Sequence, residues 1–102
     1  MANNRKTILT TEEVARAIRV DPDYNKVELQ ELAEAATSFI ANKTGHDWSQ
    51  DTNIDPTAKE CARLYVKQLH FGQDGYNKEH DYTMGIGSYI GDLKDILRKR
   101  TS

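Results

Sequence analysis

The feature that most constrains the fold is a run of apolar residues at helical spacing between Lys26 and Thr44. Apolar residues recur there at intervals of three and four, and mostly charged or polar residues lie between them. The apolar positions are Leu29, Leu32, Ala33, Ala36 and either Phe39 or Ile40. Thr44-Gly45 is a stop signal, because glycine tolerates the left-handed conformation after a last helical turn. The pattern predicts an amphipathic helix of about five turns over residues 26–44.

An earlier helix is predicted from a capping box. In Thr10-Thr11-Glu12-Glu13, the Thr10 hydroxyl and the Glu13 carboxylate can each bond the other residue's backbone amide. Val14, Ala15 and Ile18 follow at helical spacing. This helix is expected to end before Asp21-Pro22, because a residue that precedes proline is pushed out of the α region. Asp23 or Asn25 is then available to cap the helix over 26–44.

A third helix is predicted to begin at Asp55-Pro56, since proline at the first helical position loses no hydrogen bond. It runs to about Phe71, and at about 100° per residue its apolar side chains cover about 200° of the helical wheel. They are Ala58, Cys61, Ala62, Leu64, Tyr65, Val66 and Leu69. One neighbouring helix would not cover so wide an arc. Either this helix lies at the centre of the fold, or another subunit covers part of it.

The last third of the chain has a different character, since five of the six glycines fall there among several tyrosines. The stretch Gly72–Gly85 is too long for an ordinary helix connection, and such loops are commonly functional or mobile. A short hairpin within it is the alternative. A final helix is predicted over about Ile86–Lys99, with a basic end that suits the helix dipole. Its apolar stripe is Ile86, Tyr89 or Ile90, Leu93 and Leu97.

These elements predict an all-α fold, a small bundle of about four helices in one domain spanning residues 1–102. The ordered part is expected to cover about residues 7–99, and a polar loop over 46–54 contains Trp48. No long apolar run is present, so neither a signal peptide nor a membrane span is expected. The single cysteine, Cys61, is expected to be a small buried side chain in a protein made in a reducing compartment.

No pattern in the chain predicts catalysis, a metal or a cofactor. Cys61 and His70 are nine residues apart on one predicted helix, which places them on opposite faces. His46 and His80 lie in predicted loops without ligand spacing, so they are expected to be solvated. Gly85-Ile86-Gly87 lacks the third glycine and the preceding strand of a nucleotide-binding loop, and is expected to give a sharp turn into the last helix. The expected protein is therefore not an enzyme.

The charges point to two kinds of surface. Fourteen Lys and Arg against sixteen Asp and Glu give a net charge of −2, which argues against a protein that wraps nucleic acid but leaves room for a local basic patch. Acidic residues on the first two helices are expected to form solvated faces. They are Glu12, Glu13, Glu28, Glu31 and Glu34. Alternatively, a head-to-tail neighbour could pair its basic last helix with the acidic second helix and so build a ring.

Several sequence blocks together resemble the small head-tail connector proteins of long-tailed double-stranded DNA bacteriophages, over about residues 7–98. The blocks are Leu9-Thr10-Thr11-Glu12-Glu13-Val14, Asp21-Pro22-Asp23, Phe39-Ile40-Ala41-Asn42-Lys43-Thr44-Gly45, Asp55-Pro56-Thr57-Ala58-Lys59 and Ala62-Arg63-Leu64-Tyr65-Val66-Lys67-Gln68-Leu69-His70. The resemblance implies a structural protein of the virion, made in the host cytoplasm. Copies would form a ring on the portal protein, extend the DNA channel and carry the next head-completion or tail protein.

Contacts with other proteins are predicted for the loop over 72–85 and for the last helix, because aromatic anchors on mobile segments can order on docking. The predicted contact residues are Tyr76, Tyr82, Ile86, Tyr89, Ile90, Leu93, Leu97 and Arg98. The alternative is that the tyrosines cover the domain's own core.

A small nucleic-acid-binding or regulatory module is the other function that the chain suggests. It is motivated by short helices joined by tight turns and by the cations near the C-terminus, and it predicts salt-sensitive binding to a duplex. These cations are Lys94, Arg98, Lys99 and Arg100.

Overall fold

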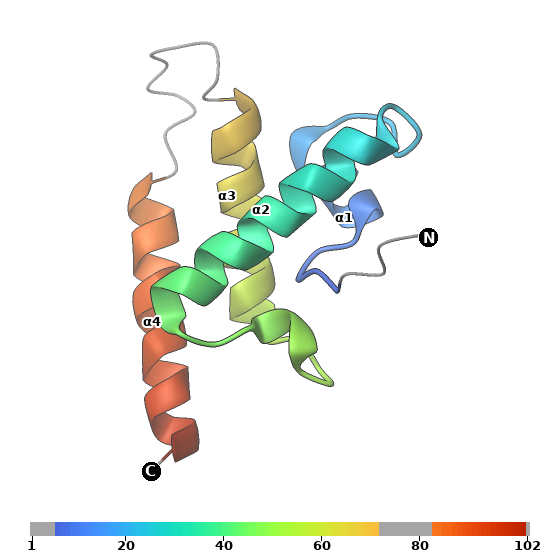
Figure 1. The fold of residues 1–102 in the computed structure, drawn as a ribbon. Coiled ribbons are helices and arrows are strands. Elements are labelled where there is room, and N and C mark those ends of the chain that lie inside the picture. The colour runs from blue at the N-terminus through green and yellow to red at the C-terminus, as the bar shows by residue number, and fades with distance from the viewer. Residues whose placement is uncertain (1–5, 72–82, 102) are drawn as a thin grey trace.

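A computed structural model describes residues 6–71 and 83–101, which form four α-helices and one short 3-10 helix (Figure 1). The elements are α1 (Thr11–Ile18), α2 (Lys26–Thr44), η1 (Trp48–Gln50), α3 (Pro56–Phe71) and α4 (Thr83–Thr101). The described ranges contain no strand, and the predicted all-α bundle is confirmed. Most of the predicted loop, with its alternative hairpin, falls in 72–82 and so lies outside the described residues.

Helix α3 is the centre of the bundle. It packs against α1, α2 and α4, and Figure 1 shows α2 crossing it while α4 runs alongside. Its fully buried side chains are small, which allows the neighbouring helices to approach closely. They are Ala58, Cys61, Ala62 and Val66. The central position expected for this helix is confirmed, while Leu64, Tyr65 and Leu69 of its apolar arc are half-buried.

The two N-terminal helices form as their capping residues predict. The Thr10 backbone amide donates to Glu13 Oε1 over 2.9 Å, and the Glu13 amide donates to Thr10 Oγ1 over 3.1 Å, which completes the capping box. Asn25 caps α2 by accepting from the Glu28 amide, and Gly45 ends α2 in the left-handed region with φ of 83°. These local hydrogen bonds explain why the predicted bounds of α2 match the observed ones.

The hydrophobic core is formed by one face of each α-helix and by the segment before α1. Of the two residues that the pattern offered near the end of α2, Ile40 is the buried one. Phe39 is partly exposed, and its ring stacks on Tyr65 with centroids 4.2 Å apart. Ile8 is buried, and its amide donates to Thr37 Oγ1 over 2.9 Å. The Thr37 hydroxyl in turn donates to the Ala33 carbonyl over 2.8 Å. This chain of hydrogen bonds attaches the N-terminal segment to the middle of α2.

Helix α4 begins earlier than predicted. It starts at Thr83, so Gly85 and Gly87 lie inside the helix, and the expected sharp turn at these glycines is wrong. A Cβ on Gly85 would lie 2.9 Å from Leu64 Cδ1, so the missing side chain lets α4 approach α3 closely. Packing against α3 stabilises the first turns of α4 despite the low helix propensity of glycine.

Candidate interaction surface

The predicted contact residues of the last helix divide into two groups. Ile86, Ile90 and Leu93 are at most 9% exposed and belong to the chain's own core, so they stabilise the subunit itself. A partner could reach them only if α4 left the bundle. Tyr89 and Leu97 are half-buried, and Arg98 is exposed. Tyr76 and Tyr82 lie outside the described residues.

A groove forms where the C-terminal end of α2 meets the second half of α4, two elements that pack together in Figure 1. Thr44, Lys94, Leu97 and Arg98 line this groove, whose volume is about 490 Å³. Arg98 also forms an ion pair with Asp95 on its own helix. The groove thus combines a half-buried leucine with two cations, a composition suited to an acidic partner with an apolar anchor. We call it the α2–α4 groove.

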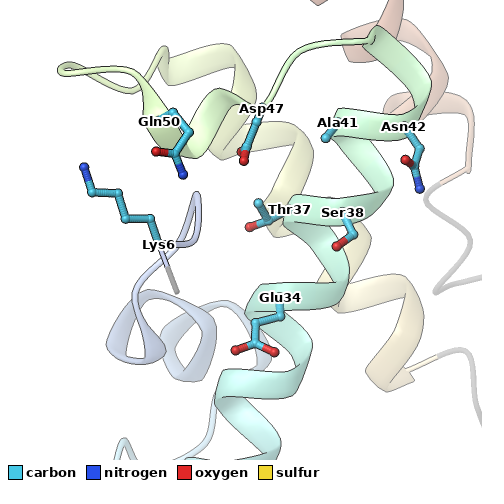
Figure 2. Close-up of a pocket in the computed structure, with 8 residues that line it drawn as sticks. All are labelled: Lys6, Glu34, Thr37, Ser38, Ala41, Asn42, Asp47 and Gln50. Carbon is cyan, nitrogen blue, oxygen red and sulfur yellow. The ribbon is translucent and has the colours of Figure 1, made fainter. Parts of the chain in front are cut away.

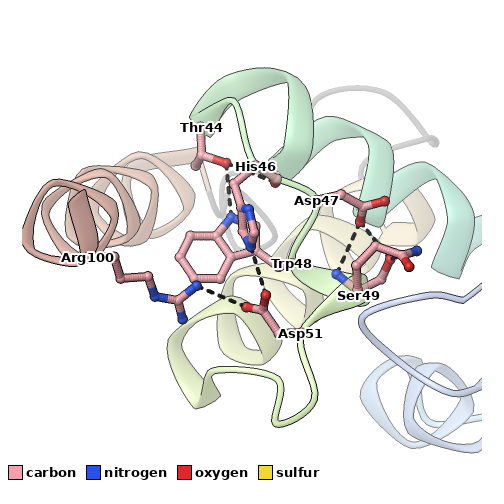
Figure 3. Close-up of polar contacts among 8 residues, drawn as sticks. Thr44, His46, Asp47, Trp48, Ser49, Asp51 and Arg100 are labelled. Carbon is pink, nitrogen blue, oxygen red and sulfur yellow. Dashed lines mark hydrogen bonds and ion pairs between the residues drawn. The ribbon is translucent and has the colours of Figure 1, made fainter.

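The loop between α2 and α3 is anchored by Trp48, which is 0% exposed. The Trp48 indole Nε1 donates to Thr44 Oγ1 over 3.0 Å (Figure 3). The Thr44 hydroxyl in turn donates to the Ile40 carbonyl over 2.8 Å. The segment predicted to be a polar loop therefore contributes a large side chain to the core. Isolated aromatic residues in polar sequence carry no periodicity, which is why the pattern did not mark this burial.

Asp51 connects this loop to the end of α4. His46 Nε2 lies 2.9 Å from Asp51 Oδ1, and Arg100 Nη1 donates to Asp51 Oδ2 over 3.2 Å (Figure 3). The Arg100 guanidinium also lies over the Trp48 ring, 5.0 Å from its centroid, where a cation–π interaction is favourable. Desolvation alone would raise the pKa of Asp51, but hydrogen bonds from His46 and Arg100 hold it below its ordinary value.

Two expectations change as a result. His46 was expected to be solvated, but it pairs with Asp51 and meets the edge of the Trp48 ring, with centroids 4.9 Å apart. Arg100 was expected to suit the dipole of its own helix and, in the alternatives, to meet a duplex or an acidic neighbour; it contacts a loop 49 residues away. Two cations of the basic tail, Arg98 and Arg100, thus already have acidic partners within the chain.

A second groove is polar and lies beside the middle of α2 (Figure 2). Its volume is about 590 Å³, and it is lined by Lys6, Glu34, Thr37, Ser38, Ala41, Asn42, Asp47 and Gln50. Its lining includes one serine, Ser38, and two acidic residues, Glu34 and Asp47. Asp47 is occupied in capping η1, since it accepts from the Ser49 amide and hydroxyl over 3.1 and 2.6 Å. The composition of this groove suits polar groups.

Two further findings concern the metal-ligating and thiol side chains of the described residues. Within these residues, no three His, Cys, Asp or Glu side chains come together as metal ligands. Burial raises the pKa of the Cys61 thiol to about 11, and its Sγ lies 3.9 Å from the Ile86 carbonyl oxygen. The prediction of a buried cysteine is confirmed. None of the helices in the part of the chain described here is long and apolar enough to cross a membrane.

No protein-family model, curated protein or solved structure matches this chain. A function is therefore proposed from the sequence blocks and from the surfaces of the bundle.

Proposed function

We propose that this protein is a structural component of a bacteriophage virion, a head-tail connector that assembles as a ring on the portal protein. The ring would extend the DNA channel, through which DNA passes without sequence-specific binding. It would also present a surface to the next head-completion or tail protein. In this role the chain needs a stable small bundle and exposed docking groups, and it needs no catalytic centre.

The observation that carries the proposal is the position of the sequence blocks that resemble the connector proteins. The capping box at Thr10, the stop at Thr44-Gly45 and the start at Asp55-Pro56 all lie at helix ends of the bundle. The block around Ala62 lies in α3, the central helix. The resemblance therefore follows the residues that define the architecture, as expected if it reflects a shared fold rather than chance composition.

The α2–α4 groove is the surface we assign to portal docking. It contains Leu97 and Arg98, two of the contact residues that the sequence predicts, and Lys94 from the same helix face. A half-buried leucine between two cations can dock on an acidic partner while the core residues of α4 stay in place.

Co-sedimentation with the portal ring of the phage that encodes the protein tests this proposal. The variant Lys94→Glu/Arg98→Glu reverses two charges in the groove and leaves the α4 core side chains untouched. Lys26→Glu, which reverses a single charge, is the control, because the Lys26 side chain is 73% exposed at the other end of α2. Circular dichroism shows whether each variant is folded. Deletion of α4 would be a poor test, since it removes Ile86, Ile90 and Leu93 from the core.

The wild-type protein and Lys26→Glu should sediment stoichiometrically with the portal ring, and the double variant should stay in the supernatant. If the wild-type protein does not bind at micromolar concentration, the connector proposal is wrong. If the folded double variant binds as well as the wild type, the portal contact lies on another surface.

A further inference from the structure

A basic groove lies between α1 and α3, which pack against each other in the bundle (Figure 1). It shares no residue with the α2–α4 groove. Its volume is about 310 Å³, and its lining consists of Glu13, Arg16, Ala17, Arg19, Arg63 and Lys67. Four of these six side chains are cationic. Because they come from helices far apart in the sequence, no single stretch of sequence marks this surface.

The one acidic residue of this α1–α3 groove does not balance its positive charge. Glu13 was expected on a solvated face, but both of its carboxylate oxygens accept from Lys59 Nζ, over 2.9 and 3.2 Å. Lys59 is not among the lining residues, and Glu13 Oε2 also lies 3.8 Å from Arg63 Nη2. Arg63 forms a closer ion pair with Glu60, over 2.7 Å, so the two acidic residues Glu13 and Glu60 face the cations Lys59 and Arg63, while Arg16, Arg19 and Lys67 add further positive charge. The groove therefore concentrates positive charge in a chain whose net charge is −2.

The backbone at Arg19 gives a second indication. Arg19 has φ of 63°, and it is the one non-glycine residue with positive φ among the described residues. It ends α1 in the left-handed conformation, a position that glycine or asparagine usually occupies. An arginine here keeps a strained backbone and adds a cation to the groove. Strain of this kind is often retained at functional positions.

The composition of the groove favours phosphate groups over an acidic protein. Three of its four cations are arginines, whose planar guanidinium matches phosphate oxygens in pairs. Arg63 and Lys67 are one helical turn apart, about 6 Å along α3. The lining holds no large apolar side chain, whereas protein-docking sites usually have an apolar or aromatic anchor. Interfaces with nucleic acid are by contrast polar and strongly positive.

We propose that the α1–α3 groove binds the phosphate backbone of duplex DNA without recognising its sequence. Arg16, Arg19, Arg63 and Lys67 supply the contacts. This inference goes beyond the connector proposal and does not depend on it, because it concerns the surface of a single chain. It also differs from binding through the basic tail, which lies on α4.

Fluorescence anisotropy with a labelled DNA duplex of mixed sequence tests the inference at several salt concentrations. With about four phosphate contacts, affinity should fall about 100-fold between about 50 and 200 mM salt. The variant Arg16→Ala/Arg19→Ala should weaken binding at least about tenfold at low salt, and it should reduce the slope of log affinity against log salt by about two. Lys26→Ala/Lys43→Ala removes the same charge from α2 and should leave the slope unchanged.

Arg19→Gly separates binding from folding. Glycine suits the left-handed backbone, so the midpoint of thermal unfolding should stay the same or rise, while the salt slope should fall by about one. A merely structural arginine would leave the slope unchanged, and that outcome would overturn the inference. Equal weakening by the α2 control pair would also overturn it, since it would show a response to net charge alone.

Competition identifies the class of ligand. DNA should displace the labelled duplex far better than polyglutamate or inorganic phosphate at equal charge. If polyglutamate competes better, the groove binds an acidic protein and the DNA inference is wrong. The groove pair Arg16→Ala/Arg19→Ala should still sediment with the portal ring, so failure of DNA binding and failure of the connector proposal give different results.

Discussion

Replacing Thr44 with valine tests how strongly the loop before α3 depends on one buried hydrogen bond. Valine keeps the shape of threonine and a similar helix propensity, so the substitution removes the hydroxyl with little change in packing. The Trp48 indole, which is 0% exposed, then loses the acceptor 3.0 Å away. A buried donor without a partner costs about 1–3 kcal/mol of folding free energy.

In a domain of this size, about 1 kcal/mol shifts the unfolding midpoint by about 4–8 °C, so Thr44→Val should lower it by about 10 °C. Circular dichroism during heating and in urea measures this change, and the fluorescence of Trp48, the single tryptophan, follows the loop itself. Thr52→Val, at an exposed loop position, should change stability by less than about 0.5 kcal/mol.

A double-mutant cycle separates this bond from other effects of the substitution. In the Trp48→Phe background no indole N–H remains, so Thr44→Val should cost at least about 1 kcal/mol less than it does in the wild type. Equal costs in both backgrounds would refute the reasoning, because the hydroxyl would then act on something other than Trp48.

Three further outcomes follow from the structure. Gly87→Ala and Gly91→Ala should each stabilise α4 by up to about 1 kcal/mol in thermal unfolding, because a Cβ there meets no atom within 4 Å; a loss would contradict this. Folding lowers the pKa values of Glu13 and Asp51, so both carboxylates stabilise the fold at pH values above their ordinary pKa values of 4.5 and 3.8. This stabilisation should be lost as the pH falls through the lowered pKa values. In urea unfolding, the free energy of unfolding of Asp51→Asn should decrease less on acidification than that of the wild type. With a pKa of about 11 rather than 9.0, Cys61 should react with a thiol reagent about 100-fold more slowly in the folded protein than in urea.

The helix ends were predictable because their signals are local. The capping box at Thr10 and the glycine after Thr44 act within one turn of chain, and α2 begins and ends where the pattern predicts. The start of α4 was not predictable in this way. There the glycine pattern suggests a turn, but α4 packs so closely on α3 that a Cβ at Gly85 would lie 2.9 Å from Leu64 Cδ1, and this packing stabilises a helix.

The candidate surfaces were only partly predictable. Helical periodicity identified the apolar stripe of α4, but it does not say whether a stripe meets its own bundle or another protein. The structure places Ile86, Ile90 and Leu93 in the core and leaves Leu97 and Arg98 at a groove.

Spacing and capping over a few residues are enough to predict that this chain is a small all-helical bundle, where its first helices begin and end, and that its central helix needs apolar neighbours on several sides. The burial of Trp48, the contact of Arg100 with Asp51 and the groove shared by cations of α1 and α3 depend on tertiary packing instead. Arg100 and Asp51 are 49 residues apart, and the groove joins two helices far apart in the sequence. Both therefore depend on how whole helices pack and not on the order of neighbouring residues.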